Sequence, residues 1–187
     1  MDKRTITLME LILAIVLLGV IILSATAIDV ASHYFFKSSD TKTQVLNEVS
    51  FILEHIQKNA SLAHGWIDNP AVAIISNSLR IRVDDPNNST PENFGDDLSL
   101  TYTFSNTNHQ LTYNNGLTTE TLSSRIVDNP DIDRDGFPEP LFSLSSSGTE
   151  VIVTLTARYD PSEPVDPKTN PEVSLQTRVF LGEHSFN

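Results

Sequence analysis

The most constraining feature of the sequence is an uncharged apolar run of 18 residues near the N-terminus, Leu11–Ile28. At about 1.5 Å per residue, a helix of this length spans about 27 Å, which nearly matches the ~30 Å hydrocarbon core of a bilayer. The remainder of the sequence is polar and contains all ten prolines. One end of the molecule is therefore suited to hydrocarbon and the other to water.

The helical pattern continues beyond the apolar run. Apolar residues recur three or four positions apart between Val30 and Ala63, with charged residues between them, and Val20–His64 contains neither glycine nor proline. This spacing predicts one continuous helix over residues 6–64, ended by Gly65. Its membrane half is residues 6–28, and its amphipathic half, residues 29–65, is expected to pack on a soluble head formed by residues 66–187.

Glu10 limits how the N-terminal segment can be interpreted. Residues 1–28 are compatible with a cleaved secretory signal peptide, with a plain membrane anchor, or with a helix that assembles with other helices. A carboxylate beside a membrane segment is costly and is usually functional, although an interfacial glutamate that reaches water is the simpler alternative. A signal peptide is also not expected to run without a loop into a long amphipathic helix.

The segment Lys3–Leu11, followed by the apolar run, resembles the class III signal of type IV prepilins and type II secretion pseudopilins. The resemblance implies that residues 1–5 are a leader, which a prepilin peptidase removes between Thr5 and Ile6. Ile6 would then become the methylated N-terminus, and Glu10 the carboxylate that assists assembly. A buried glutamate needs a cationic partner, and the N-terminal ammonium of a neighbouring subunit can be that partner.

The resemblance also implies where in the cell the chain is located and which proteins it assembles with. It predicts a single-pass protein of the bacterial inner membrane with a periplasmic or extracellular head, assembled with other pilin or pseudopilin subunits, most simply as a minor subunit. Thr5 stands where the family has glycine. The chain is therefore either cut there or remains a full-length membrane subunit. A different class of function stays open, namely a membrane-anchored β-domain that binds a ligand or partner without forming filaments.

The head has the period-two alternation of β-strands, bounded by turn residues. The fold class predicted is α+β, with the long helix packed on an antiparallel sheet. Residues Thr118–Val127 are ambiguous, and hairpins are expected around Ser105–His109 and Ser145–Glu150. The predicted strands are Ala71–Ser76, Leu79–Val83, Leu98–Phe104, Gln110–Tyr113, Phe142–Leu144, Val151–Ala157 and Val173–Leu181.

An acidic stretch in the head predicts a calcium loop. Its carboxylates alternate and a glycine, Gly136, stands sixth, as in the first half of a calcium-binding loop. Position twelve is Phe142 instead of a bidentate glutamate, so the alternative is a solvated acidic turn. The predicted ligands are Asp131, Asp133, Asp135, the backbone carbonyl of Phe137, and Glu139.

Composition narrows the function classes. The formal net charge is −12, of which the last 117 residues carry −10, and such an acidic surface argues against binding to nucleic acid. The sequence has no cysteine, which excludes disulfides and thiolate chemistry. The five histidines lack metal-ligand spacing, and no nucleophile or nucleotide motif occurs, so we expect no enzyme.

Overall fold

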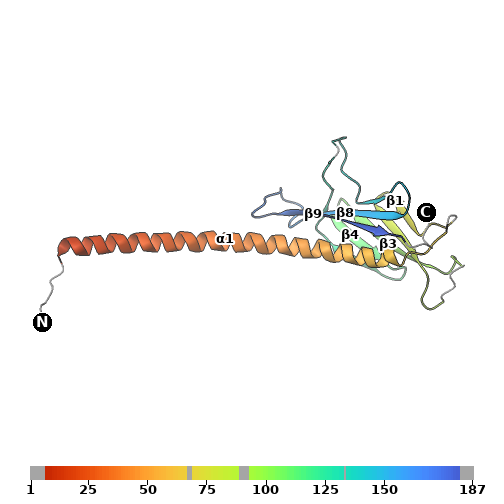
Figure 1. Ribbon diagram of the computed structural model, residues 1–187, viewed down its shortest axis with the longest axis horizontal. Helices are drawn as coiled ribbons and strands as arrows, with labels where there is room; N and C mark the ends of the chain where they lie inside the picture. Colours follow the sequence, from red (N-terminus) through yellow and green to blue (C-terminus); the bar gives the residue numbers. More distant parts are fainter. Residues whose placement is uncertain (1–6, 67–68, 89–92, 133, 182–187) are drawn as a thin grey trace.

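The computed structural model describes residues 7–66, 69–88, 93–132 and 134–181. A single long helix, α1 (Leu8–Ser61), extends from a β-rich head that packs around its C-terminal part (Figure 1). The described residues form nine strands, which are β1 (Val72–Ile75), β2 (Ser78–Val83), β3 (Leu98–Ser105), β4 (Gln110–Asn114), β5 (Thr119–Ser123), β6 (Ile126–Val127), β7 (Phe142–Leu144), β8 (Glu150–Arg158) and β9 (Glu172–Phe180). The α+β prediction is therefore confirmed.

Helix α1 is 54 residues long, or about 81 Å, and its ends differ from the predicted 6–64. It begins at Leu8 because Thr7 is an extended N-cap residue that forms a capping box with Glu10. It ends at Ser61, where the backbone N–H of Leu62 donates to the carbonyl of Asn59 at 3.2 Å, tightening the last turn. Ile6 lies outside the described residues.

Gly65 does not end the helix, so that prediction was wrong. A Cβ atom at Gly65 would lie 2.2 Å from the backbone nitrogen of Ala71 and 2.7 Å from the carbonyl oxygen of Asn69. Glycine is needed at this position because two backbone segments pass in contact after the helix has finished. A glycine after a periodic segment usually indicates the end of a helix. Here it instead indicates a position where two backbone segments lie in contact.

One stripe of α1 is buried against the head. Its spacing of three or four residues places its members on one face of the helix. The stripe consists of Thr41, Val45, Val49, Ile52, Leu53, Ile56 and Ala60. Helix α1 packs against β8 and β9 and also reaches β2, and the core lies between it and the strands.

The head contains two antiparallel sheets where one was expected. Strands β1 to β5 form a meander in chain order, whereas β8 pairs with β6 and β7 along one edge and with β9 along the other. The ambiguous segment Thr118–Val127 is divided between β5 and β6, because the chain turns at Ser123, whose hydroxyl accepts a hydrogen bond from the backbone N–H of Arg125 at 2.9 Å. Both expected hairpins are confirmed, as β3–β4 and β7–β8.

Candidate functional site

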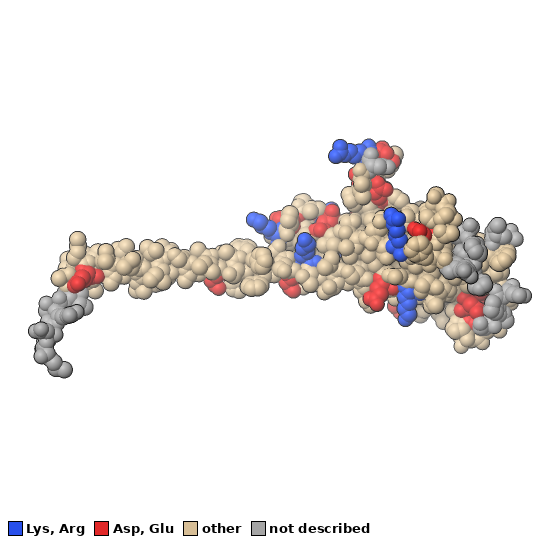
Figure 2. Space-filling model, in the orientation of Figure 1, with Lys and Arg blue, Asp and Glu red and all other residues tan. Residues whose placement is uncertain are grey.

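The N-terminal half of α1 is the most unusual surface of the molecule. Within the described part of the chain, α1 is the one helix long and apolar enough to cross a membrane, and none of its apolar window is buried by the rest of the molecule. Figure 2 shows this half as a shaft with few charged side chains, while Lys, Arg, Asp and Glu gather over the head. A shaft of this kind needs a cover of lipid or of other apolar helices.

Hydroxyl groups within the shaft are satisfied by the helix itself. Ser24 Oγ donates to the carbonyl of Val20 at 2.8 Å, and Thr26 Oγ1 donates to the carbonyl of Leu23 at 2.9 Å. Such hydrogen bonds to the preceding turn remove the penalty of placing a hydroxyl in hydrocarbon. The small polar residues are therefore compatible with an apolar surrounding.

Glu10 is held at the start of the shaft by Thr7. The backbone N–H and the hydroxyl of Thr7 donate to Glu10 Oε2 at 2.9 and 3.0 Å, and Thr7 Oγ1 accepts from the backbone N–H of Glu10 at 3.3 Å. The carboxylate also lies at the positive end of the helix dipole, which stabilises an anion. The predicted processing residues Thr5 and Ile6 lie outside the described residues, so the structure does not relate them to Glu10.

The predicted calcium loop is an exposed arm that projects from the head on the side away from α1 (Figure 1). The backbone N–H of Gly136 donates to Asp131 Oδ2 at 3.0 Å, and that of Phe137 donates to Asp135 Oδ1 at 2.8 Å. Gly136 has φ +93°, which only glycine adopts without strain. Asp133 lies outside the described residues, and the described residues contain no group of three metal-ligating side chains. Calcium binding thus stays a prediction.

Calcium titration checks this prediction. If the loop binds calcium, isothermal titration of the detergent-solubilised protein should show heat that is lost in Asp133→Ala and strongly reduced in Asp131→Asn. The asparagine keeps an oxygen that can accept the Gly136 N–H, so it removes charge with little change to the turn. Equal heats for all three proteins, or no heat from the unmodified chain, would contradict the prediction.

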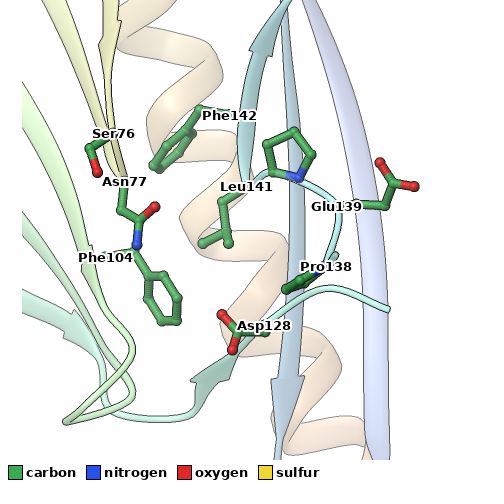
Figure 3. Close-up of a pocket in the computed structure, with 9 residues that line it drawn as sticks. Ser76, Asn77, Phe104, Asp128, Pro138, Glu139, Leu141 and Phe142 are labelled. Atoms are coloured by element: carbon green, nitrogen blue, oxygen red, sulfur yellow. The ribbon is translucent and has the colours of Figure 1, made fainter. Parts of the chain in front are cut away.

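Glu139 lies at the base of the arm, beside a small cavity between the two sheets. The cavity has a volume of about 100 Å³, and Phe104, Leu141 and Phe142 form much of its apolar wall. In Figure 3 the carboxylate of Glu139 points away from the other lining residues. Ligand sites usually measure about 300–1,000 Å³, so this cavity is too small for a cofactor.

Two pairs of aspartates lie at the ends of the segment between β2 and β3, and all four residues are partly buried. The pairs are Asp84–Asp85 and Asp96–Asp97. The side chain of Asp97 is 3% exposed, and its Oδ2 lies 3.8 Å from Arg82 Nε without a hydrogen bond. Burial raises the pKa of Asp97, and the neighbouring side chains of His64 and Arg82 oppose this effect. Asp97 is therefore a buried partner of β2 rather than a solvated loop residue.

A polar cluster between α1 and the first sheet was not predicted from the sequence. Asn59 Nδ2 donates to the hydroxyl of Tyr102 at 2.6 Å, and that hydroxyl lies 2.8 Å from His55 Nδ1. The ring of His55 also packs edge-on against Tyr113, with centroids 4.8 Å apart. Because Asn59 can only donate here, the simplest arrangement has the tyrosine donating to a neutral His55.

The cluster predicts a pH dependence of stability. Burial lowers the pKa of His55, with a further lowering by Lys58 and an opposing effect of Glu120. Since the unfolded chain binds the proton more readily, the free energy of unfolding should fall as pH decreases through and below about 6.5. Urea unfolding at several pH values should show a smaller fall for His55→Gln than for the unmodified chain. His33→Gln, which removes an exposed histidine outside the cluster, is the control for the substitution itself.

Comparisons with protein-family models, with curated proteins and with solved structures find no match to this chain.

Proposed function

We propose that this chain is a structural subunit of a type IV pilus-like or type II secretion pseudopilus filament. It is inserted in the inner membrane through the N-terminal half of α1, with the head on the outer side, and it assembles with other pilin-like subunits through the same helix. The proposal rests on the resemblance of Lys3–Leu11 to a prepilin signal and on the form of the helix.

One observation carries the proposal furthest, namely the division of α1 into two halves with different surroundings. The C-terminal half buries its stripe in the head, from Thr41 to Ala60, whereas every described residue from Leu8 to Val30 is exposed. A lone membrane anchor needs about 20 residues to cross a bilayer and does not require a helix that continues into its domain. Here one continuous helix joins the apolar half to the head. Such a connection suits a filament subunit, because packing of the helix in the filament then also sets the position of the head.

The position of Glu10 supports assembly through the shaft. Among apolar helices packed in a bundle, an unpaired carboxylate is costly, and a positive group of a neighbouring subunit offsets that cost. Such a pair would fix the axial position of one helix against the next, as polar residues do in coiled coils. The acidic head, in turn, gives the assembled surface a negative charge that favours solubility.

One feature favours the alternative, a single-pass anchored β-domain that binds a ligand or partner without forming filaments. The carboxylate of Glu10 already accepts two hydrogen bonds from Thr7 of its own chain. A capping role of this kind requires no second subunit. The two functions therefore differ in whether Glu10 acts within one molecule or between molecules.

Mass spectrometry of the N-terminus discriminates between these functions. For a filament subunit, the membrane-extracted protein should begin at a methylated Ile6, with the first five residues absent. A chain that still begins at the leader in cells that assemble filaments would favour the anchored β-domain. Cleavage after Ala25 or Ala27 would show a secretory signal peptide and would contradict both functions.

A further inference from the structure

A collar of exposed aromatic side chains surrounds α1 between the shaft and the head. Tyr34, Phe35 and Phe36 are 72, 70 and 68% exposed, and the rings of the two phenylalanines pack edge-on with centroids 6.1 Å apart. Three successive helical positions point in directions about 100° apart, so no single neighbouring element of the same chain can cover them. We call these three residues the collar.

The collar lies at the depth of a membrane interface. If the ~30 Å hydrocarbon core begins at Leu11, its far boundary falls near residue 31, and the collar lies about 4–8 Å beyond that boundary. The charged Asp29 is then about 3 Å inside the boundary, where a carboxylate costs less than at the centre of the bilayer. The distance of the collar from the boundary falls within the polar headgroup layer, which adds about 5–8 Å to each side of the ~30 Å core. Aromatic side chains concentrate in this layer. The first lysine after the apolar run is Lys37, directly after the collar, where its ammonium can reach water.

One loop of the head reaches the same level along the helix. The loop between β8 and β9, residues 159–171, is the part of the head nearest the shaft (Figure 1). Ser38, one turn after Tyr34, donates from its hydroxyl to the carbonyl of Pro167 at 3.3 Å. Val165, close to this contact in the chain, is 49% exposed. The loop therefore brings one exposed apolar side chain, Val165, close to the collar, between the charged residues Glu163 and Asp166.

Hydrogen bonds among its own residues fix the conformation of this loop. The side chain of Asn170 is buried, and its Nδ2 lies 2.9 Å from the carbonyl oxygen of Asp160 and 3.0 Å from those of Glu163 and Pro164. Asp160 accepts hydrogen bonds from Ser162 of the same loop. A loop fixed in this way holds its exposed valine at a constant height on the helix.

We propose that the collar and the loop tip, Pro164–Val165, contact the headgroup layer of a phospholipid bilayer and fix the height of the head above the membrane. This inference depends on one part of the proposed function, the insertion of the shaft into a membrane. It does not depend on filament assembly. The occupant of this surface in the unassembled subunit is lipid. The main rival is a second copy of the chain.

Tryptophan fluorescence in vesicles tests the inference. The single tryptophan, Trp66, is first replaced by phenylalanine. The full chain then receives one tryptophan in place of Leu17, Phe36, Val165 or Phe51, and is reconstituted in phosphatidylcholine vesicles whose lipids are brominated high on the acyl chain. Phe51 is the matched control, because it is an exposed phenylalanine of the same helix about 22 Å beyond Phe36.

The expected order of quenching follows from these depths. Leu17→Trp and Phe36→Trp should both be quenched, Phe36→Trp at least about twice as strongly as Phe51→Trp, and Val165→Trp more strongly than Phe51→Trp. If Leu17→Trp is quenched while Phe36→Trp and Val165→Trp behave like Phe51→Trp, the inference is overturned and membrane insertion stands. If Leu17→Trp is not quenched, insertion and the inference both fail.

The same vesicles distinguish lipid from a second copy. Emission of Phe36→Trp should depend on bromination and should not change when the protein-to-lipid ratio is lowered ten-fold. A change with that ratio, without quenching, would mean that other copies cover the collar, and would overturn the inference.

Discussion

Replacing Glu10 by leucine is expected to abolish incorporation of the chain into filaments while leaving it in the membrane. If the carboxylate pairs with a positive group of a neighbouring subunit in an apolar bundle, breaking that pair leaves a buried charge without a partner. Such a loss typically costs about 3–5 kcal/mol. One contact of this size corresponds to a fall in association of roughly 10²- to 4 × 10³-fold. The measurement is the amount of the chain that sediments with sheared or extracted filaments.

A matched variant separates pairing between subunits from capping within one chain. Thr7→Val removes the hydroxyl that exchanges hydrogen bonds with Glu10 but keeps the carboxylate and the volume of the side chain. Losing an N-cap costs about 1 kcal/mol, which a helix of 54 residues tolerates. We therefore expect Thr7→Val to assemble. If both variants assemble normally, or if both fail equally, Glu10 acts only as a cap and the pairing account is wrong.

Gly65→Ala is expected to have the largest effect on the stability of the head. The added Cβ would lie 2.2 Å from the nitrogen and 2.6 Å from the Cα of Ala71, closer than real Cβ contacts. Both atoms belong to the backbone, so relief requires the segment leading into β1 to move from the end of α1. Overpacking typically costs about 1–3 kcal/mol, and we expect the upper end of that range or beyond.

Urea unfolding of the detergent-solubilised protein measures this effect. Gly95→Ala is the control, because its Cβ would meet only the side-chain oxygen of Asn93, at 3.2 Å, and that side chain can rotate. We expect the Gly95→Ala midpoint to lie close to that of the unmodified chain and the Gly65→Ala midpoint to fall clearly. Equal midpoints for the two variants would contradict the close approach of the two backbone segments.

The long helix and most strands could be predicted because their signals are local. The apolar run and the spacing of three or four residues that follows it predict the helix, and the absence of proline, and of glycine after Gly19, allows it to continue for 15 turns. Leu100, Tyr102 and Phe104 alternate on β3 and are all buried, as the period of two predicts. Local patterns of this kind are visible without knowledge of the partner elements.

The division into two sheets could not be predicted, because strand pairing depends on contacts distant in the sequence. The buried Asn129 illustrates this. Its amide donates to the carbonyl of Thr154 at 2.9 Å, and its oxygen accepts from Thr156 Oγ1 at 2.8 Å, so it fastens the chain after β6 to β8. In the sequence this asparagine lies next to a proline and reads as an ordinary turn residue.

The candidate site, like the fold, could be predicted only where its signals are local in the sequence. The apolar run predicts a segment able to cross a membrane directly, because its length and lack of charge are properties of the sequence alone. The contact between Tyr102 and His55 was not predictable, because 47 positions separate the two residues. The tyrosine alternates with apolar residues and reads as ordinary core, and only the folded chain brings its hydroxyl to the helix.

Photo-crosslinking from the shaft measures whether this helix packs against the helices of other subunits. A photoreactive amino acid replaces Leu17 in the cells that produce the protein, and the crosslinked peptides are identified by mass spectrometry. We expect adducts with the apolar N-terminal helices of pilin-like subunits, including other copies of this chain, and we expect these adducts to be lost in Glu10→Leu. Adducts with lipid alone, in cells that assemble filaments, would contradict assembly through this helix.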